Sequence, residues 1–184
     1  MKDECLIPTE RMPLDEPLHS DGPGIYFIFL NSGISLEDFP VGESRLLYIG
    51  KAESAIAARH HAHYETSAQS TLRRSLGAIL RRGRALFPDF SVLPRKSEGK
   101  ITEKAIQSYR FTEESECILS DWMLKNLTFC YRIVKTGIRD LERCYIKKWN
   151  PILNLTHSKN SHRRTLEELR RQCRVEARKW TRKS

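Results

Sequence analysis

The segment Ile25-Tyr26-Phe27-Ile28-Phe29-Leu30 constrains the fold more than any other part of this 184-residue chain. All of its side chains are apolar or aromatic, so both of its alternating faces need to be covered. A strand of this kind lies inside a sheet and is packed on each side. The chain is long enough to bury such a core within one compact domain, without disulfides or metals to hold it together.

Two further segments have the character of strands, Arg45 to Gly50 and Phe129 to Val134. Most of the remaining pattern is helical, with apolar residues on one side and charged residues elsewhere. Thr165 and Glu168 form a capping-box pattern that predicts the start of a last helix, whose apolar seam is Leu166, Leu169, Cys173, Ala177 and Trp180. We expect the helices over residues 54–59, 71–82, 112–127 and 138–149, and from 165 onwards.

Charge and turn residues divide the chain into three parts. Residues 1–20 contain three prolines and no usable period, so we interpret them as an N-terminal arm. Residues 21–156 form the expected main domain, with a helical insertion over about residues 71–127. Residues 157–184 form a basic helical tail, in which ten Lys or Arg against three Glu carry +7 of the net charge of +9. This charge favours a polyanionic partner.

The cysteines and the apolar runs exclude several classes of protein. Five scattered cysteines without a C-x-x-C pair argue against a zinc ribbon and against a disulfide framework, and they favour a reducing compartment. The start of the chain has no apolar signal region, and the longest apolar run is too short to cross a membrane. We therefore expect a cytoplasmic protein with no membrane partner. The sequence makes no prediction about its oligomeric state.

Two tripeptides carry the strongest functional signal, Gly24-Ile25-Tyr26 and Tyr48-Ile49-Gly50, each on an expected strand. In this order, with Lys51 and then a helix after the second, they resemble the GIY-YIG nuclease family. The resemblance implies an endonuclease that hydrolyses phosphodiester bonds. It also implies an α/β (α+β) fold with a small three-stranded antiparallel sheet flanked by helices. The stretch from Arg59 to Glu142 exceeds the family's shorter spacing, which is why we expect an insertion there.

The helix after the second strand carries Arg59, and His63 follows one turn later on the same face. Both match family positions, an Arg and a frequent His. A guanidinium binds a phosphate through two hydrogen bonds and stabilises negative charge that grows on it. Without the strand motifs, a solvated basic helix face would explain these residues equally well. His60 and His61 match no family position and are interpreted as surface or substrate-contacting residues.

Glu142 is singled out by its own position as well as by the resemblance. It lies beside the apolar stripe of its expected helix, and a carboxylate directed toward a core needs a cation or hydrogen-bond donors. Helix position alone leaves a structural salt bridge and a metal ligand equally open. The family motif favours the metal ligand. Asn154 matches a late Asn of the family and is expected to hold neighbouring groups by hydrogen bonds, although Asn is also common in turns next to Pro.

The resemblance also implies a mechanism. A divalent ion on Glu142, expected to be Mg²⁺ with Mn²⁺ as the alternative, would stabilise the leaving oxyanion while Arg59 binds the phosphoryl group. Tyr48 is the candidate general base for the attacking water. Because the pKa of free tyrosine is about 10, this role needs strongly cationic surroundings. Tyr26, Lys51 and His63 are the residues that could supply them or share the proton transfer.

The expected partner is nucleic acid, in the first place double-stranded DNA. Two arginine-rich segments, one in the insertion and one in the tail, are candidate backbone contacts, and for the insertion segment a solvated helix is nearly as good an explanation. The tail helix could dock on the core, join a partner helix or lie along phosphates, and we favour docking with phosphate contact. The candidate nucleic-acid-binding residues are Arg73, Arg74, Arg81, Arg82, Arg163 and Arg164.

Two rival functions are compatible with parts of the sequence. A non-catalytic nucleic-acid-binding module on the same fold should have lost Tyr48, Arg59 or Glu142, and all three are present. A basic structural or RNA-associated protein would explain the charge but not the position of Glu142. Because a fold does not settle a function, the sequence does not separate restriction, repair, recombination and mobile-element nucleases. It also contains no recognisable helix-turn-helix or zinc-finger spacing.

Overall fold

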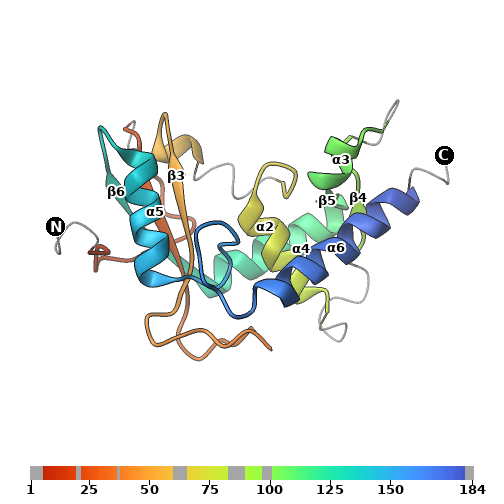
Figure 1. The fold of residues 1–184 in the computed structure, drawn as a ribbon, viewed down its shortest axis with the longest axis horizontal. Coiled ribbons are helices and arrows are strands. Elements are labelled where there is room, and N and C mark those ends of the chain that lie inside the picture. The colour runs from red at the N-terminus through yellow and green to blue at the C-terminus, as the bar shows by residue number, and fades with distance from the viewer. Residues whose placement is uncertain are drawn as a thin grey trace. The chain divides into compact units, whose positions relative to one another are not determined.

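The computed structural model describes residues 6–19, 22–36, 38–59, 66–82, 90–96 and 101–180. The chain forms two compact units. The first combines Met1–His61 with Trp122–Arg163, and the second combines Ala62–Asp121 with Arg164–Ser184. The first unit contains the large sheet, and the second consists mainly of helices (Figure 1).

The sheet of the first unit is antiparallel and has the strand order β1-β6-β2-β3. The mixed fold and the antiparallel pairing expected from the sequence are confirmed, but the sheet has four strands rather than three. The additional strand comes from the N-terminal arm, where Met12 and Pro13 pair with Phe129 and Thr128. The strands are β1 (Met12–Pro13), β2 (Gly24–Leu30), β3 (Leu46–Ala52) and β6 (Leu127–Ile133).

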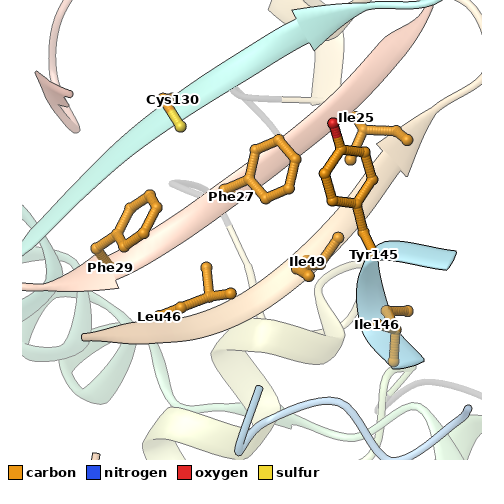
Figure 2. Packing of buried hydrophobic residues seen from close by; sticks show 8 residues of the cluster. All are labelled: Ile25, Phe27, Phe29, Leu46, Ile49, Cys130, Tyr145 and Ile146. Carbon is orange, nitrogen blue, oxygen red and sulfur yellow. The ribbon is translucent and has the colours of Figure 1, made fainter. Parts of the chain in front are cut away.

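Strand β2 is the centre of this sheet, as its apolar sequence predicts, and all of its residues are buried. On one face, Ile25, Phe27 and Phe29 pack with residues of β3, β6 and helix α5 (Ile138–Trp149). The Tyr145 ring of α5 meets the Phe27 ring edge-on, with centroids 4.8 Å apart. Figure 2 shows this cluster between the strands and the helix. The opposite face of β2 is thereby left for Tyr26.

The N-terminal arm packs against this core instead of extending from it. The Tyr145 hydroxyl donates a hydrogen bond to the Leu6 carbonyl at 2.8 Å, and the Cys130 thiol donates to the Pro8 carbonyl at 3.5 Å. The Arg11 guanidinium lies 3.9 Å from the centroid of the Phe29 ring. These contacts attach the described part of the arm, residues 6–19, to the first unit.

The described part of the second unit consists of helices and one short pair of antiparallel strands. Strands β4 (Val92–Leu93) and β5 (Arg110–Phe111) and helix α3 (Glu103–Gln107) were not predicted, because the sequence pattern over residues 83–110 gave no clear elements. Helix α4 belongs to this unit up to Asp121 and to the first unit from Trp122. The elements are α2 (Thr71–Leu80), β4 (Val92–Leu93), α3 (Glu103–Gln107), β5 (Arg110–Phe111), α4 (Glu113–Asn126) and α6 (Arg163–Trp180).

Helix α6 begins earlier than its sequence predicts. The expected capping box is wrong, because Thr165 lies inside the first turn and Glu168 pairs with Arg171 at 2.7 Å. Asn160 holds the start of the helix instead, since its carbonyl accepts from the Arg163 amide at 3.2 Å. The predicted apolar seam is buried as far as Ala177, whereas Trp180 at its end is 45% exposed.

One cysteine departs from the expectation of free thiols. Cys144 is disulfide-bonded, whereas Cys117, Cys130 and Cys173 are free. Cysteine spacing along the chain does not reveal such a pairing, because it depends on which residues the fold brings together. None of the described helices is both long and apolar enough to span a membrane.

A buried ion pair joins α2 to α4 within the second unit. The Arg73 side chain is fully buried, and its guanidinium donates to Glu116 Oε2 at 2.7 Å. Glu116 also accepts from the Ser67 amide at 2.8 Å and the Phe111 amide at 3.2 Å. Ser120 Oγ accepts a further bond from Arg73 at 3.0 Å. The charges of both partners are therefore satisfied in the interior, which makes burial of the pair tolerable.

Removing one member of this pair should destabilise the protein strongly. Arg73→Met leaves Glu116 as an uncompensated buried carboxylate, and we expect the free energy of unfolding to fall by about 3–5 kcal/mol. Urea denaturation followed by circular dichroism measures it. Arg171→Met, which removes a cation from the exposed pair with Glu168, is the matched control and should leave the free energy of unfolding nearly unchanged, because solvent screens an exposed pair. Equal effects of the two substitutions would contradict this account.

Candidate active site

The Tyr26 ring lies directly over Gly50 of the neighbouring strand. The two residues are opposite each other in the β2–β3 pairing, so the Tyr26 side chain lies on the face of the sheet where a side chain of residue 50 would lie. A Cβ placed on Gly50 would lie 2.3 Å from both Cζ and Oη of Tyr26. Only glycine leaves room for the ring at this position. The last residue of the second tripeptide is thus required by the last residue of the first.

Gly24 has an equally direct reason to be glycine. A Cβ at this position would lie 2.5 Å from the Arg132 carbonyl oxygen of β6 and 2.9 Å from the Ile56 side chain. Ile56 opens the helical residues 56–59 that follow β3, and its amide donates to the Gly22 carbonyl at 3.0 Å. The missing side chain therefore lets this helical segment lie close to the start of β2.

A chain of polar contacts connects Tyr48, Tyr26 and Arg59 on this face of the sheet. The Tyr26 and Tyr48 ring centroids are 6.2 Å apart, and their hydroxyls are hydrogen-bonded. Arg59 Nε donates to the Tyr26 hydroxyl at 3.4 Å. The three residues singled out from two strands and a helix thus meet at one place. His63, His60 and His61 lie outside the described residues.

Burial dominates the proton affinity of both tyrosines. It raises the pKa of Tyr26, although the neighbouring Arg59 guanidinium opposes the shift. It also raises the pKa of Tyr48 far above the usual value, with a further contribution from Tyr26 and an opposing one from Arg59. Both phenols are therefore neutral at physiological pH in these surroundings. The cationic environment expected to favour a phenolate at Tyr48 is outweighed by desolvation.

Glu142 comes from helix α5 and meets Lys51 at the end of β3. The Lys51 ammonium lies 3.6 Å from Glu142 Oε2 and 3.3 Å from Glu53 Oε1, so it bridges two carboxylates. Arg139, one turn earlier on α5, donates to the same Glu53 oxygen at 2.9 Å. Glu142 also interacts electrostatically with Tyr26, Tyr48 and Arg59, which makes it part of the same site. The carboxylate of Glu142, expected beside an apolar stripe, thus faces the ammonium of Lys51.

The surroundings of Glu142 suit a metal ligand that shares its ion with a substrate. Its side chain is 19% exposed, and burial raises the pKa of its carboxyl against the opposing effects of Lys51 and His157. A partly desolvated carboxylate of this kind gains from a bound cation. Among the residues that the structure describes, no three His, Cys, Asp or Glu gather into a complete metal site. Mg²⁺ needs only one or two carboxylates when phosphate oxygens and waters complete its shell, so the donor set fits.

Asn154 holds the exposed edge of β3. Its side-chain oxygen accepts from the Ile49 amide at 2.9 Å, and its side-chain nitrogen donates to the Ile49 carbonyl at 2.8 Å. The preceding residue, Leu153, donates its amide to the Leu47 carbonyl at 2.9 Å. The Asn154 side chain thereby pairs with the backbone of Ile49 as a neighbouring strand would. These bonds attach Asn154 to the strand that carries the second tripeptide.

His157 is a site residue that the sequence analysis did not single out. It follows Asn154 by three positions, is exposed, and lies close enough to Glu142 to act on it electrostatically. Its φ of 64° is in the left-handed region that non-glycine residues rarely adopt. The sequence signal was the histidine itself, but its proximity to a residue fifteen positions earlier is a product of the fold.

The arginines expected to bind nucleic acid divide into two groups. Arg73 is fully buried with Glu116, so its predicted role as a nucleic-acid contact is wrong. Arg74 donates to the Ser67 and Ala68 carbonyls at 2.8 and 3.0 Å, and Arg81 pairs with Glu176 at 2.5 Å. These guanidiniums are used within the second unit. Those on the surface are Arg82, Arg163 and Arg164.

The comparison with protein-family models gives a match. Residues 24–172 match the family model described as the GIY-YIG catalytic domain. In the comparisons with curated proteins and with solved structures, nothing matches. The matched range begins at Gly24 and includes Tyr48, Arg59, Glu142 and Asn154.

The contact between Gly50 and Tyr26 leads to a stability prediction. Gly50→Ala forces the ring or the strand to move, and overpacking of this kind costs about 1–3 kcal/mol in the free energy of unfolding. Urea denaturation measures this change. Gly42→Ala is the matched control, because a Cβ on Gly42 has no atom within 4 Å and should leave stability nearly unchanged. Unchanged stability of Gly50→Ala would show that the ring is not confined by this glycine.

Proposed function

Because this chain belongs to the GIY-YIG family, whose activity is in general that of a nuclease, we propose that it is a metal-dependent endonuclease that hydrolyses phosphodiester bonds in DNA. The observation that carries the proposal is the convergence of Arg59 with Tyr26 and Tyr48, with Glu142 acting on all three. A phosphate-binding cation and a desolvated carboxylate at one place supply the electrostatic groups that this hydrolysis needs.

Arg59 is proposed to bind the phosphoryl group. Its Nε donates to the Tyr26 hydroxyl, and the terminal nitrogens of the planar guanidinium are the donors that we propose for phosphate oxygens. The bond to Tyr26 links the guanidinium to the strand that carries the first tripeptide. Negative charge that grows on the phosphoryl oxygens during attack is stabilised by a cation that is already in place.

Glu142 is proposed to hold a divalent ion, expected to be Mg²⁺ with Mn²⁺ as the alternative. When bound there, such an ion would supply Lewis-acid stabilisation of charge on the phosphate and leaving oxygens. Lys51 occupies the cationic position beside Glu142 and is itself held by Glu53. Lys51 therefore has a second carboxylate partner available whenever Glu142 binds another cation.

Tyr48 is retained as the candidate general base, with a clear physical requirement. Its hydroxyl lies in the same hydrogen-bonded chain as Tyr26 and Arg59, so it would lie near a phosphate bound by Arg59. Desolvation raises the pKa of Tyr48 more than Arg59 lowers it. Acting as a base thus requires more positive charge than the described residues supply by themselves.

The rival function is a nucleic-acid-binding module without turnover. It would share the sheet and the basic surface but would not need a half-buried carboxylate beside the tyrosines. Retention of Glu142 together with Arg59 favours the enzyme, because each would be costly to keep partly desolvated without a use.

Substitution of either charged group should abolish most of the activity. We expect Glu142→Gln and Arg59→Ala to lower the rate of Mg²⁺-dependent plasmid cleavage by about 10²–10³, as for the removal of one electrostatic stabiliser of a transition state. Arg59→Lys should remain well below the wild type, because an ammonium does not bind phosphate bidentately. Chelation by EDTA should stop cleavage by the wild type.

Asp140→Asn is the control for this experiment, since it neutralises an exposed carboxylate of the same helix. It should cleave at nearly the wild-type rate. Full activity of both Glu142→Gln and Arg59→Ala would exclude the proposed site, and binding of DNA without any cleavage by the wild type would favour the rival module.

Double-stranded DNA is the partner proposed for this site. The surface arginines Arg82, Arg163 and Arg164 are the remaining candidates for contacts with its backbone. Arg163 and Arg164 begin α6, whose own acidic residues are partly engaged, Glu168 with Arg171 and Glu176 with Arg81. The exposed start of this helix therefore presents an excess of positive charge.

Removal of this charge should weaken DNA binding and its dependence on salt together. For Arg163→Ala/Arg164→Ala we expect the slope of log K against log salt to fall by about 0.9 for each phosphate that the variant no longer neutralises. Fluorescence anisotropy with a labelled duplex over a salt series measures it. Gln172→Ala, at an exposed uncharged residue of the same helix, is the control and should leave the slope unchanged. An unchanged slope in the double variant would exclude this surface.

A further inference from the structure

His157 occupies a turn that is fastened to the active-site strand. The side-chain amide of Asn154 hydrogen-bonds both the backbone amide and the backbone carbonyl of Ile49, which lies between Tyr48 and Gly50. Ser158 then closes the turn, because its hydroxyl donates to the Asn154 carbonyl. His157 lies between these two residues, so its backbone position is determined by hydrogen bonds to the strand that carries Tyr48.

The far end of the turn is fastened as well. The Lys159 amide donates to Asn150 Oδ1 at 2.7 Å, and Asn150 ends helix α5, the helix that carries Glu142. Both supports of the turn therefore belong to elements of the active site. His157 itself has φ 64°, a strained conformation for a residue with a side chain, and such strain persists where the surroundings enforce it.

The imidazole is exposed, whereas the phenol at the centre of the site is buried. Tyr26 is only 4% exposed, but His157 belongs to the exposed residues and acts electrostatically on Glu142. The other charged groups at this place are Lys51, Arg59 and Arg139, opposed by Glu53 and Glu142. Three cations against two carboxylates, with an imidazole donor beside them, form a surface suited to a phosphodiester backbone.

We propose that the imidazole of His157 is a further substrate contact of this active site, which donates a hydrogen bond to a backbone phosphate bound beside Glu142. The inference rests on the proposed function, since it takes the same nucleic acid as substrate. It adds a residue from the turn after Asn154 to the strand and helix residues of the site. It also gives the strained backbone at His157 a use, because the turn holds an exposed imidazole near Glu142.

Three substitutions separate the hydrogen bond from the shape of the turn. His157→Gly removes the imidazole and adopts a positive φ without strain. His157→Asn also tolerates this conformation and keeps a donor near the position of Nδ1, whereas His157→Gln keeps one near Nε2. His19→Gly, which removes an exposed imidazole from the N-terminal arm, is the matched control.

The measurement is the affinity of the full-length protein for a fluorescein-labelled duplex DNA in EDTA, followed by anisotropy. We expect His157→Gly to weaken binding about tenfold, as for one hydrogen bond to a charged group. Either His157→Asn or His157→Gln should recover most of this affinity, and His19→Gly should bind like the wild type. Thermal unfolding of each variant shows whether the turn itself has changed stability.

Two results would overturn the inference. Equal affinity of the wild type and His157→Gly would exclude the contact while leaving the proposed hydrolysis intact. Equally weakened binding by His157→Gly, His157→Asn and His157→Gln would exclude a hydrogen bond from this position. A wild type that binds the duplex without Mg²⁺-dependent cleavage would contradict the proposed function instead, and the variants would still decide whether His157 meets the phosphate.

Discussion

The close approach of Tyr26 to Gly50 is the contact on which the candidate site depends. Because the ring of one strand fills the space of a side chain on the next, the pairing of β2 with β3 and the position of the Tyr26 hydroxyl are fixed together. A shift of register by one residue would move every side chain to the other face and remove the ring from its glycine. Arg59 and Tyr48 then find their partner at one defined point.

The two units use arginine in different physical ways. Arg73 is enclosed with Glu116 and several hydrogen-bond partners, so its charge holds two helices together. Among the described residues, Arg59 donates a long hydrogen bond to a neutral phenol, at 3.4 Å, and it is only partly buried. Composition treats the two residues alike, but only the second belongs to the site for which we propose phosphate binding. Net charge therefore indicates a class of partner, whereas burial and pairing decide which cations can meet it.

Much of the fold was predictable because its signals are local. The apolar sequence of β2 indicated a central strand, and the stripe of α5 indicated a helix that the structure confirms from Ile138 to Trp149. The start of α6 was predicted wrongly. Thr165 and Glu168 have the spacing of a capping box, but the helix begins at Arg163, whose amide donates to the Asn160 carbonyl. The short strand of Met12 and Pro13 was missed, since an edge pair of this length has no period of its own.

The sequence by itself determined the family, the order of the main elements and the identity of the chemical groups, because motifs, periodicity and side-chain chemistry are local properties of the sequence. Only the tertiary structure decided which of these groups act together. It buried Arg73, brought His157 near Glu142, placed Lys51 between two carboxylates and raised the pKa of Tyr48. Distances across the fold and the exclusion of solvent set these properties, and neither follows from positions along the chain.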